Sequence, residues 1–85
     1  MNKKEYNKIE KECQDLLDDF GFADKDVAVS QLKSIFNVEF KDVNIAGTLK
    51  GKTIYEVHYK DYIIELEINH YEFKIKNIFE YDDTI

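Results

Sequence analysis

The sequence predicts a two-layer α+β sandwich in which two N-terminal helices pack on one face of a four-stranded antiparallel meander, in the order ααββββ. Two patterns lead to this prediction. Apolar residues recur at intervals of three and four through the first 36 residues, which is typical of amphipathic helices. Apolar and polar residues then alternate along the second half, which is typical of strands with one buried face. Residues 1–85 are expected to form a single domain, because a chain of this length supports one core.

The first helix is expected to run from Lys3 to about Phe20. Its apolar stripe consists of Tyr6, Ile9, Cys13, Leu16, Leu17 and Phe20. Gly21 can adopt a left-handed conformation after the last turn, which would place Phe22 over Leu17. The helix should therefore end within a residue of Phe20.

A second, shorter helix is expected after Asp24, which is a suitable N-cap and is followed by Asp26 in the first turn. Residues 27–29 taken alone could form an extended segment. The spacing continues to Leu32 and Ile35, however, and this favours a helix. The expected inner face consists of Ala28, Leu32, Ile35 and Phe36.

The first strand is expected at residues 38–46, with a bulge at Lys41-Asp42 where the alternation changes phase. Residues 47–52 contain two glycines and are expected to form the loop to the second strand. This connection predicts two facing pairs, Val43 with Val57 and Ile45 with Tyr55.

The other three strands are expected between Thr53 and Phe79, joined by two-residue turns at Lys60-Asp61 and Asn69-His70. The first turn predicts the facing pairs Tyr59/Tyr62, Val57/Ile64, Tyr55/Leu66 and Thr53/Ile68. The second predicts Ile68/Tyr71, Leu66/Phe73 and Ile64/Ile75. Both registers give the same inner face, and a slip of one residue would turn that face toward water. Residues 80–85 are expected to be a frayed acidic tail.

The net charge is −6, and all 12 basic residues are lysines. Direct nucleic-acid binding is not expected, because the chain has an acidic balance and lacks the arginines that grip phosphates and guanines. Residues 1–40 and residues 41–85 each contain six lysines and nine acidic residues. The even distribution along the chain predicts that neither half forms a basic lobe.

A cytoplasmic location without membrane association is expected. No apolar run approaches the roughly 20 residues that cross a bilayer, and no hydrophobic segment follows the basic N-terminus. The single cysteine, Cys13, cannot form an internal disulfide and is expected to be a buried, inert thiol. The abundance of Ile, Lys, Asn and Tyr indicates AT-rich coding DNA, as in a low-GC bacterium, its phages or its plasmids.

Two acidic groups are the candidate partner-binding residues. On the outer sheet face, Glu56 is expected to face Glu65, and Glu67 to face Glu72. A second group lies near the C-terminal end of the first helix, where the helix dipole disfavours negative charge, and consists of Asp15, Asp18 and Asp19. The partner would be a larger protein with a basic surface. The alternative is that these charges only keep the surface soluble.

The sequence gives little indication of chemistry. Glu56, His58 and Glu65 could reach one ion, but any acidic sheet with one histidine shows this spacing, so no metal or cofactor is expected. Cys13 lies among acidic residues, an unsuitable setting for a nucleophile. Residues 47–51 lack the pattern of a phosphate-binding loop. An enzyme is therefore not expected.

The sequence favours a small, non-catalytic protein-binding module. Its most concrete form is a phage or mobile-element inhibitor of a host nucleic-acid enzyme, such as a restriction or CRISPR nuclease. The alternative is a small ligand-binding or regulatory subunit of a cellular complex, which could form a homodimer through an edge strand or through the outer isoleucines Ile54, Ile63 and Ile78. The class of partner distinguishes the two hypotheses.

Overall fold

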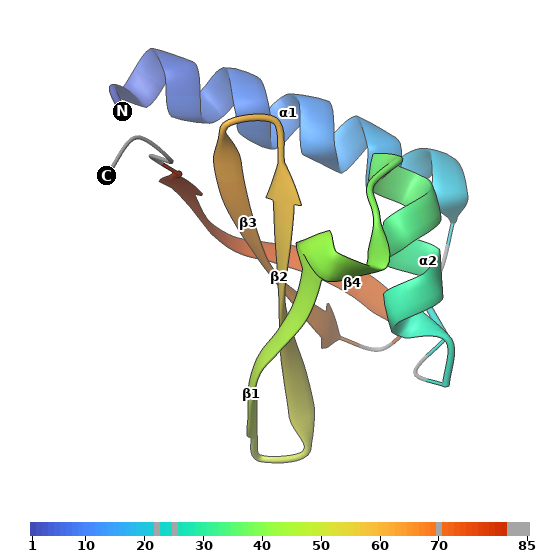
Figure 1. Cartoon of the computed structure of the whole chain (residues 1–85). Coiled ribbons are helices and arrows are strands. Elements are labelled where there is room, and N and C mark those ends of the chain that lie inside the picture. The colour runs from blue at the N-terminus through green and yellow to red at the C-terminus, as the bar shows by residue number, and fades with distance from the viewer. Residues whose placement is uncertain (22, 25, 70, 82–85) are drawn as a thin grey trace.

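The structure, a computed structural model, describes residues 1–21, 23–24, 26–69 and 71–81 (Figure 1). Two helices precede a four-stranded antiparallel sheet whose strand order is β1-β2-β3-β4, which confirms the predicted fold. The elements are α1 (Lys3–Phe20), α2 (Ala28–Phe36), the 3-10 turn η1 (Phe40–Asp42), β1 (Val43–Leu49), β2 (Lys52–Tyr59), β3 (Tyr62–Asn69) and β4 (Glu72–Glu80).

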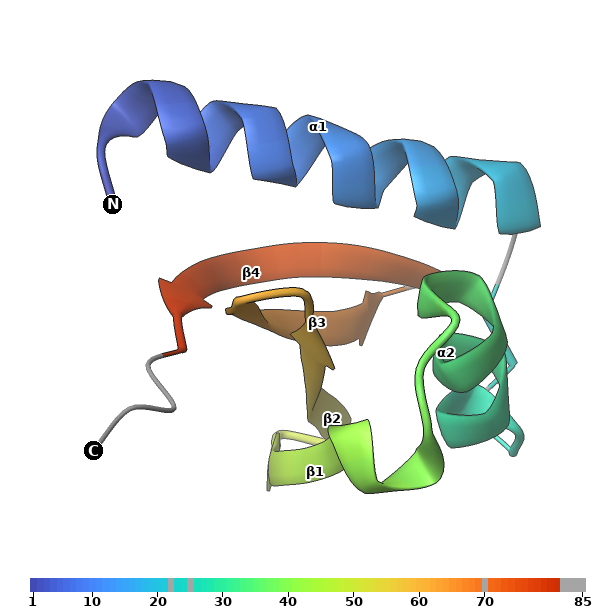
Figure 2. The same cartoon turned by 45° about the horizontal axis from the view of Figure 1, so that its top comes forward.

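Helix α1 extends along strand β4, and α2 lies at one end of the sheet (Figure 2). The core forms where the helices meet the inner sheet face, and its most enclosed side chains are Cys13, Leu32, Val57, Ile64 and Leu66.

Helix α1 begins where Asn2 accepts a hydrogen bond from the Glu5 amide, at 2.8 Å. It ends at Gly21, whose φ of +99° suits glycine and whose amide donates to the Leu17 carbonyl. The predicted limits of α1 are confirmed, whereas the predicted Phe22 contact lies outside the described residues.

Two glutamates spaced seven residues apart tie α1 to the β2–β3 hairpin. The Tyr62 hydroxyl donates to Glu5 at 2.9 Å, and the Tyr59 hydroxyl donates to Glu12 at 2.7 Å. The ammonium group of Lys60 also donates to Glu12. Hydrogen bonds from Lys60 and Tyr59 hold the pKa of Glu12 below its ordinary value. These polar contacts fix the position of the helix along the sheet, and the sequence did not reveal them.

Helix α2 begins later than predicted, at Ala28, and its N-cap Val27 provides no side-chain hydrogen bond. The Asp24 carboxylate instead accepts a hydrogen bond from the Asp26 amide at 2.9 Å, so it closes a local turn and does not cap the helix. The prediction of Asp24 as the N-cap was therefore wrong. The expected inner face is present: Ala28, Leu32 and Phe36 are buried, and Ile35 packs against them.

The first strand also begins later than predicted. Residues 40–42 form η1, because Glu39 and Asp42 each accept a hydrogen bond from the other's backbone amide. The predicted bulge at Lys41-Asp42 was therefore wrong, and a register shift occurs between Ile45 and Gly47 instead. The predicted loop shrinks to Lys50-Gly51, where both φ angles are positive, as a type I′ turn requires. Both predicted pairs, Val43/Val57 and Ile45/Tyr55, are confirmed.

The β2–β3 hairpin follows the prediction, and the β3–β4 hairpin does not. Pairs Tyr59/Tyr62, Val57/Ile64 and Tyr55/Leu66 are confirmed, although pairing ends at Ile54/Glu67, one step before Thr53/Ile68. In the β3–β4 hairpin Asn69 faces Glu72, so the true register is Ile68/Phe73 and Leu66/Ile75. The positive φ belongs to Tyr71 and not to Asn69, and His70 of the predicted turn lies outside the described residues.

A register shift beside Glu65 and Leu66 changes which side chains of β4 point inward. Beyond it Ile64 faces Ile78, which is only 3% exposed, whereas Phe79 is 45% exposed. Regular alternation from the inward-facing Phe73 and Ile75 would instead place Ile78 on the outer face. The expected fraying was also wrong for the start of the tail, because Glu80 belongs to β4 and the Tyr81 amide donates to the Asp61 carbonyl at 2.8 Å. Residues 82–85 lie outside the described residues.

Candidate partner-binding groove

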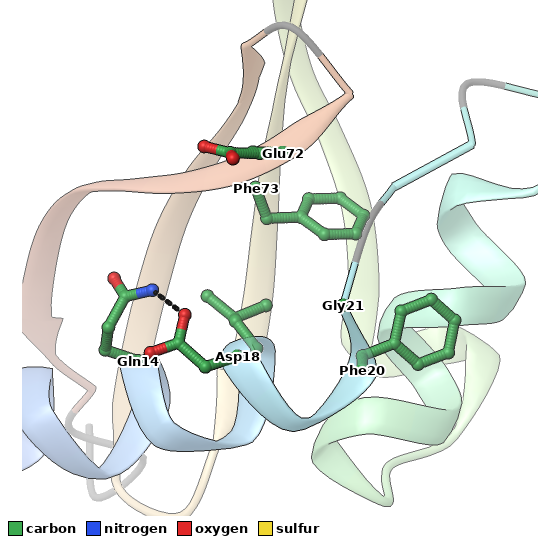
Figure 3. A pocket seen from close by; sticks show the side chains of 7 residues that line it. Gln14, Asp18, Phe20, Gly21, Glu72 and Phe73 are labelled. Atoms are coloured by element: carbon green, nitrogen blue, oxygen red, sulfur yellow. Dashed lines mark hydrogen bonds between the residues drawn. The ribbon is translucent and has the colours of Figure 1, made fainter.

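A groove separates helix α1 from strand β4, and we call it the α1–β4 groove. One part, about 110 Å³, is lined by Gln14, Leu17, Asp18, Phe20, Gly21, Glu72 and Phe73 (Figure 3). The other part, about 540 Å³, is lined by Asn7, Glu10, Lys11, Gln14, Asp15, Lys74 and Ile75. Gln14 borders both parts, and both are lined by α1 and β4.

The helical wall of the groove follows from residue spacing. Asn7, Lys11, Gln14 and Asp18 recur at intervals of four, three and four, which places them on one line of the helix. The opposite wall is β4, an edge strand that pairs only with β3 within the described chain. Alternate backbone N–H and C=O groups of an edge strand point away from the sheet and are available to another chain.

The groove combines an apolar floor with an acidic rim. Leu17 and Phe73 are buried beneath it, and the Phe20 ring is exposed at its end. Its lining includes four carboxylates and two lysines; the acidic residues are Glu10, Asp15, Asp18 and Glu72. Lys11 forms an ion pair with Asp15 at 3.2 Å, and the Gln14 amide donates to Asp18 at 2.9 Å. The rim therefore retains negative charge after these contacts.

The structure brings together three candidate residues that the sequence had placed in two separate groups. Asp15 and Asp18 from the helix and Glu72 from the sheet all line the α1–β4 groove, whereas Asp19 is exposed outside it. The sequence reasoning missed Gln14 and Phe20 as groove residues. The polar line along α1 was a visible signal for Gln14, but the identity of the facing strand required the fold.

The remaining candidates lie on the outer sheet face and behave differently from one another. Glu56 faces Glu65 as predicted, and both side chains are partly exposed. Glu67 was expected to be exposed and to face Glu72, but it is only 7% exposed and faces Lys74. Its carboxylate lies 3.5 Å from each of two ammonium groups, those of Lys52 and Lys76.

The charge state of Glu67 reflects these neighbours. Burial of the carboxyl group acts to raise its pKa, but the two ammonium groups outweigh that effect and hold the pKa below its ordinary value. Glu67 is therefore an ionised group that is already paired within the chain. Among the described residues, no group of His, Cys, Asp and Glu side chains gathers closely enough to hold a metal ion.

Cys13 lies on the inner face of α1 with no exposed surface. Burial raises the pKa of its thiol to about 12, so the reactive thiolate is not formed near neutral pH.

None of the helices in the described part of the chain is long and apolar enough to cross a membrane. No protein-family model, curated protein or solved structure matches the chain.

Proposed function

We propose that this chain is a non-catalytic protein-binding module that accepts an extended, positively charged segment of a larger partner in the α1–β4 groove. The observation that supports this most directly is the position of an acidic rim beside β4, whose outer edge pairs with no other strand of the described residues. Either feature alone is common on small domains. Together, the edge of β4 would form hydrogen bonds with the main chain of the partner, and the acidic rim beside it would select a positively charged segment.

The backbone provides the first contribution to binding. An added strand would lie about 4.8 Å from β4 and would use its outward N–H and C=O groups. Such pairing is independent of side-chain identity, so it supplies affinity without choosing the partner. The flank of α1 would then lie over the added strand and contact every second side chain.

The side chains provide selectivity. Lysine or arginine residues of the partner would meet Asp15, Asp18 and Glu72, while their aliphatic stems would cover the apolar floor. Exposed charges mainly accelerate association and are screened within about 10 Å at 0.1 M salt. Binding should therefore weaken as the salt concentration rises.

A matched pair of charge reversals tests the location of the site. Asp15→Lys, Asp18→Lys and Glu72→Lys together should weaken binding of a basic partner by about 100-fold, on the order of 1 kcal/mol for each lost pair. The control, Asp19→Lys, Glu56→Lys and Glu65→Lys, changes the net charge equally and should have a much smaller effect. Loss of binding in the control alone would assign the site to the outer sheet face.

The more specific version of this proposal is an inhibitor of a host nucleic-acid enzyme. Such enzymes present basic surfaces to phosphate backbones, and a chain of net charge −6 without arginine complements them. Titration into purified restriction and CRISPR nucleases should abolish activity of the target at a one-to-one ratio, and the groove reversal should remove the inhibition. Retained activity of every nuclease tested would reject this version and leave the peptide-binding role to be tested separately.

A second candidate, a subunit that self-associates through the other sheet edge, is favoured by one specific observation. Phe40 and Ile45 are 57% and 60% exposed, and with Val27 they border a hollow of about 360 Å³ beside β1. Exposed apolar groups next to an edge strand are typical of interfaces. Sedimentation velocity should then show a dimer that dissociates on Ile45→Lys, and a monomer at all concentrations would reject this candidate.

A further inference from the structure

We infer that the outer face of the sheet contains a second site, which binds a compact polyphosphate group. A pocket of about 300 Å³, here called the lysine pocket, is lined by Lys50, Lys52, Ile54, Glu67, Asn69, Lys74 and Lys76. The even distribution of charge along the sequence gave no sign of this pocket. The fold gathers lysines that are far apart in the chain.

The sheet topology explains this gathering. Lys50 lies in the turn before β2 and Lys52 begins that strand, while Lys74 and Lys76 belong to β4. Strand β3 runs between β2 and β4 and places Glu67 opposite Lys74. The β3–β4 register is therefore what brings the two pairs of lysines around one carboxylate.

Glu67 acts as an internal anchor for this pocket. Its carboxylate lies 3.5 Å from the ammonium groups of both Lys52 and Lys76, so two long side chains that would otherwise be mobile are held toward the same point. Four lysines against one glutamate leave a net charge of +3 in the pocket, in a chain whose total is −6. The Asn69 side chain adds a hydrogen-bond donor at the edge.

The dimensions of the lysine pocket favour linked phosphates over a single phosphate. Lys74 and Lys76 are two residues apart, which is about 7 Å along a strand, and β2 lies about 10 Å from β4. Lys52 and Lys76 already converge on Glu67, and Lys50 and Lys74 also line the pocket, so two or three linked phosphates can contact more of the four lysines than one phosphate can. A volume of about 300 Å³ is at the small end for ligand pockets. Lysine is a common point-charge binder of phosphate.

This inference does not depend on the proposed protein-binding role. Lys74 is the only residue shared by the linings of the lysine pocket and the α1–β4 groove, among the described residues. A test that leaves Lys74 intact therefore examines one site without altering the other. Lys50 and Lys76 are suitable positions, because neither lines the groove.

The experiment is a titration of the ¹⁵N-labelled protein with tripolyphosphate, ATP and orthophosphate at equal ionic strength. Tripolyphosphate should bind saturably at one site, with amide shifts concentrated at residues 50–54, 67–69 and 74–76. Orthophosphate should bind at least about 10-fold more weakly, because it can contact fewer of the four lysines at once. Tighter binding of ATP than of tripolyphosphate would identify a nucleotide as the source of the phosphates, and equal binding would identify the phosphate chain alone.

The variant Lys50→Gln with Lys76→Gln should weaken tripolyphosphate binding by at least about 10-fold. The control, Lys3→Gln with Lys4→Gln, removes the same charge from α1 and should leave binding unchanged. Urea unfolding midpoints verify that both variants are folded. Absence of saturable binding, equal loss in the control, or affinity for single-stranded oligonucleotides that exceeds tripolyphosphate and grows with length would each overturn the inference.

Discussion

Glu12 shows how one charged side chain determines where a helix lies. Its carboxylate accepts hydrogen bonds from Tyr59 and Lys60, and these lower its pKa below the ordinary value of 4.5. The variant Glu12→Gln should lower the free energy of unfolding by about 1 kcal/mol at pH 7, because the charged hydrogen bond to Lys60 is lost.

The pH dependence of this difference has a definite sign. A carboxylate whose pKa is lowered in the folded state stabilises the fold at pH values above its pKa in the unfolded chain. That contribution is lost as the pH falls through the pKa of the folded state. The difference between the wild type and Glu12→Gln should therefore shrink in urea titrations as the pH falls from 4.5 through the lowered folded pKa. A difference that persists unchanged at pH 3 would contradict the role assigned to the Glu12 carboxylate.

Cys13 should make the stability of the fold decrease as the pH rises in the alkaline range. Its thiol pKa is raised to about 12 from 9.0 by burial, so the unfolded chain ionises first and stability falls as the pH rises between these values. We expect a loss of about 1 kcal/mol per pH unit in that interval, which should be absent in Cys13→Ala. At pH 8 the thiol should react with a disulfide reagent only as fast as the protein unfolds. Rapid reaction of the folded protein would contradict its burial.

Strand β4 contains the largest difference between the sequence prediction and the structure, and a pair of substitutions tests it. Ile78 is buried and Phe79 is exposed because the register shifts beside Glu65. Ile78→Ala should lower the free energy of unfolding by about 3 kcal/mol, whereas Phe79→Ala should change it by less than about 1 kcal/mol. The regular alternation predicted from the sequence requires the reverse order, so chemical denaturation of both variants distinguishes the two registers.

The cause of that difference is physical. A shift of two residues keeps Phe73 and Ile75 on the inner face, so the hydrophobic pattern is equally satisfied by the predicted and the observed registers. The Lys60-Asp61 turn was predictable because its flanking pairs are apolar on both strands. The burial of Glu67 and its ion pairs with Lys52 and Lys76 were not predictable, since they belong to the observed β3–β4 register, in which Lys74 and not Glu72 lies opposite. The groove acids Asp15 and Asp18 were visible in the sequence, but their proximity to Glu72 was not.

The start of helix α2 offers a test with a stabilising outcome. Val27 occupies the N-cap, provides no side-chain hydrogen bond and is exposed. Val27→Asp should raise the free energy of unfolding by about 1 kcal/mol. An aspartate at this position can accept a hydrogen bond from an unpaired backbone N–H of the first turn, and its negative charge interacts favourably with the helix dipole. Val27→Ala controls for removal of the valine. A helix that began directly after Asp24 would gain nothing from this change.

Across the whole molecule, charges that are distributed evenly along the sequence are gathered by the fold into two surfaces of opposite sign. The acidic α1–β4 groove and the lysine pocket lie on either side of β4, and both depend on elements that are distant in the chain. Salt should therefore act on the two surfaces in parallel and weaken both basic-peptide and polyphosphate binding. Because the sites share only Lys74 among the described residues, occupation of one should change the affinity of the other only slightly.

Titration of the ¹⁵N-labelled protein with a lysine-rich, strand-forming peptide tests whether the α1–β4 groove binds a basic extended segment. Binding there should give saturable shifts at residues 7–21 and 72–75, with slowed amide exchange in β4 and no response to a glutamate-rich peptide of equal length. Shifts confined to the surroundings of Glu56 and Glu65, or no saturable response to the basic peptide, would contradict it.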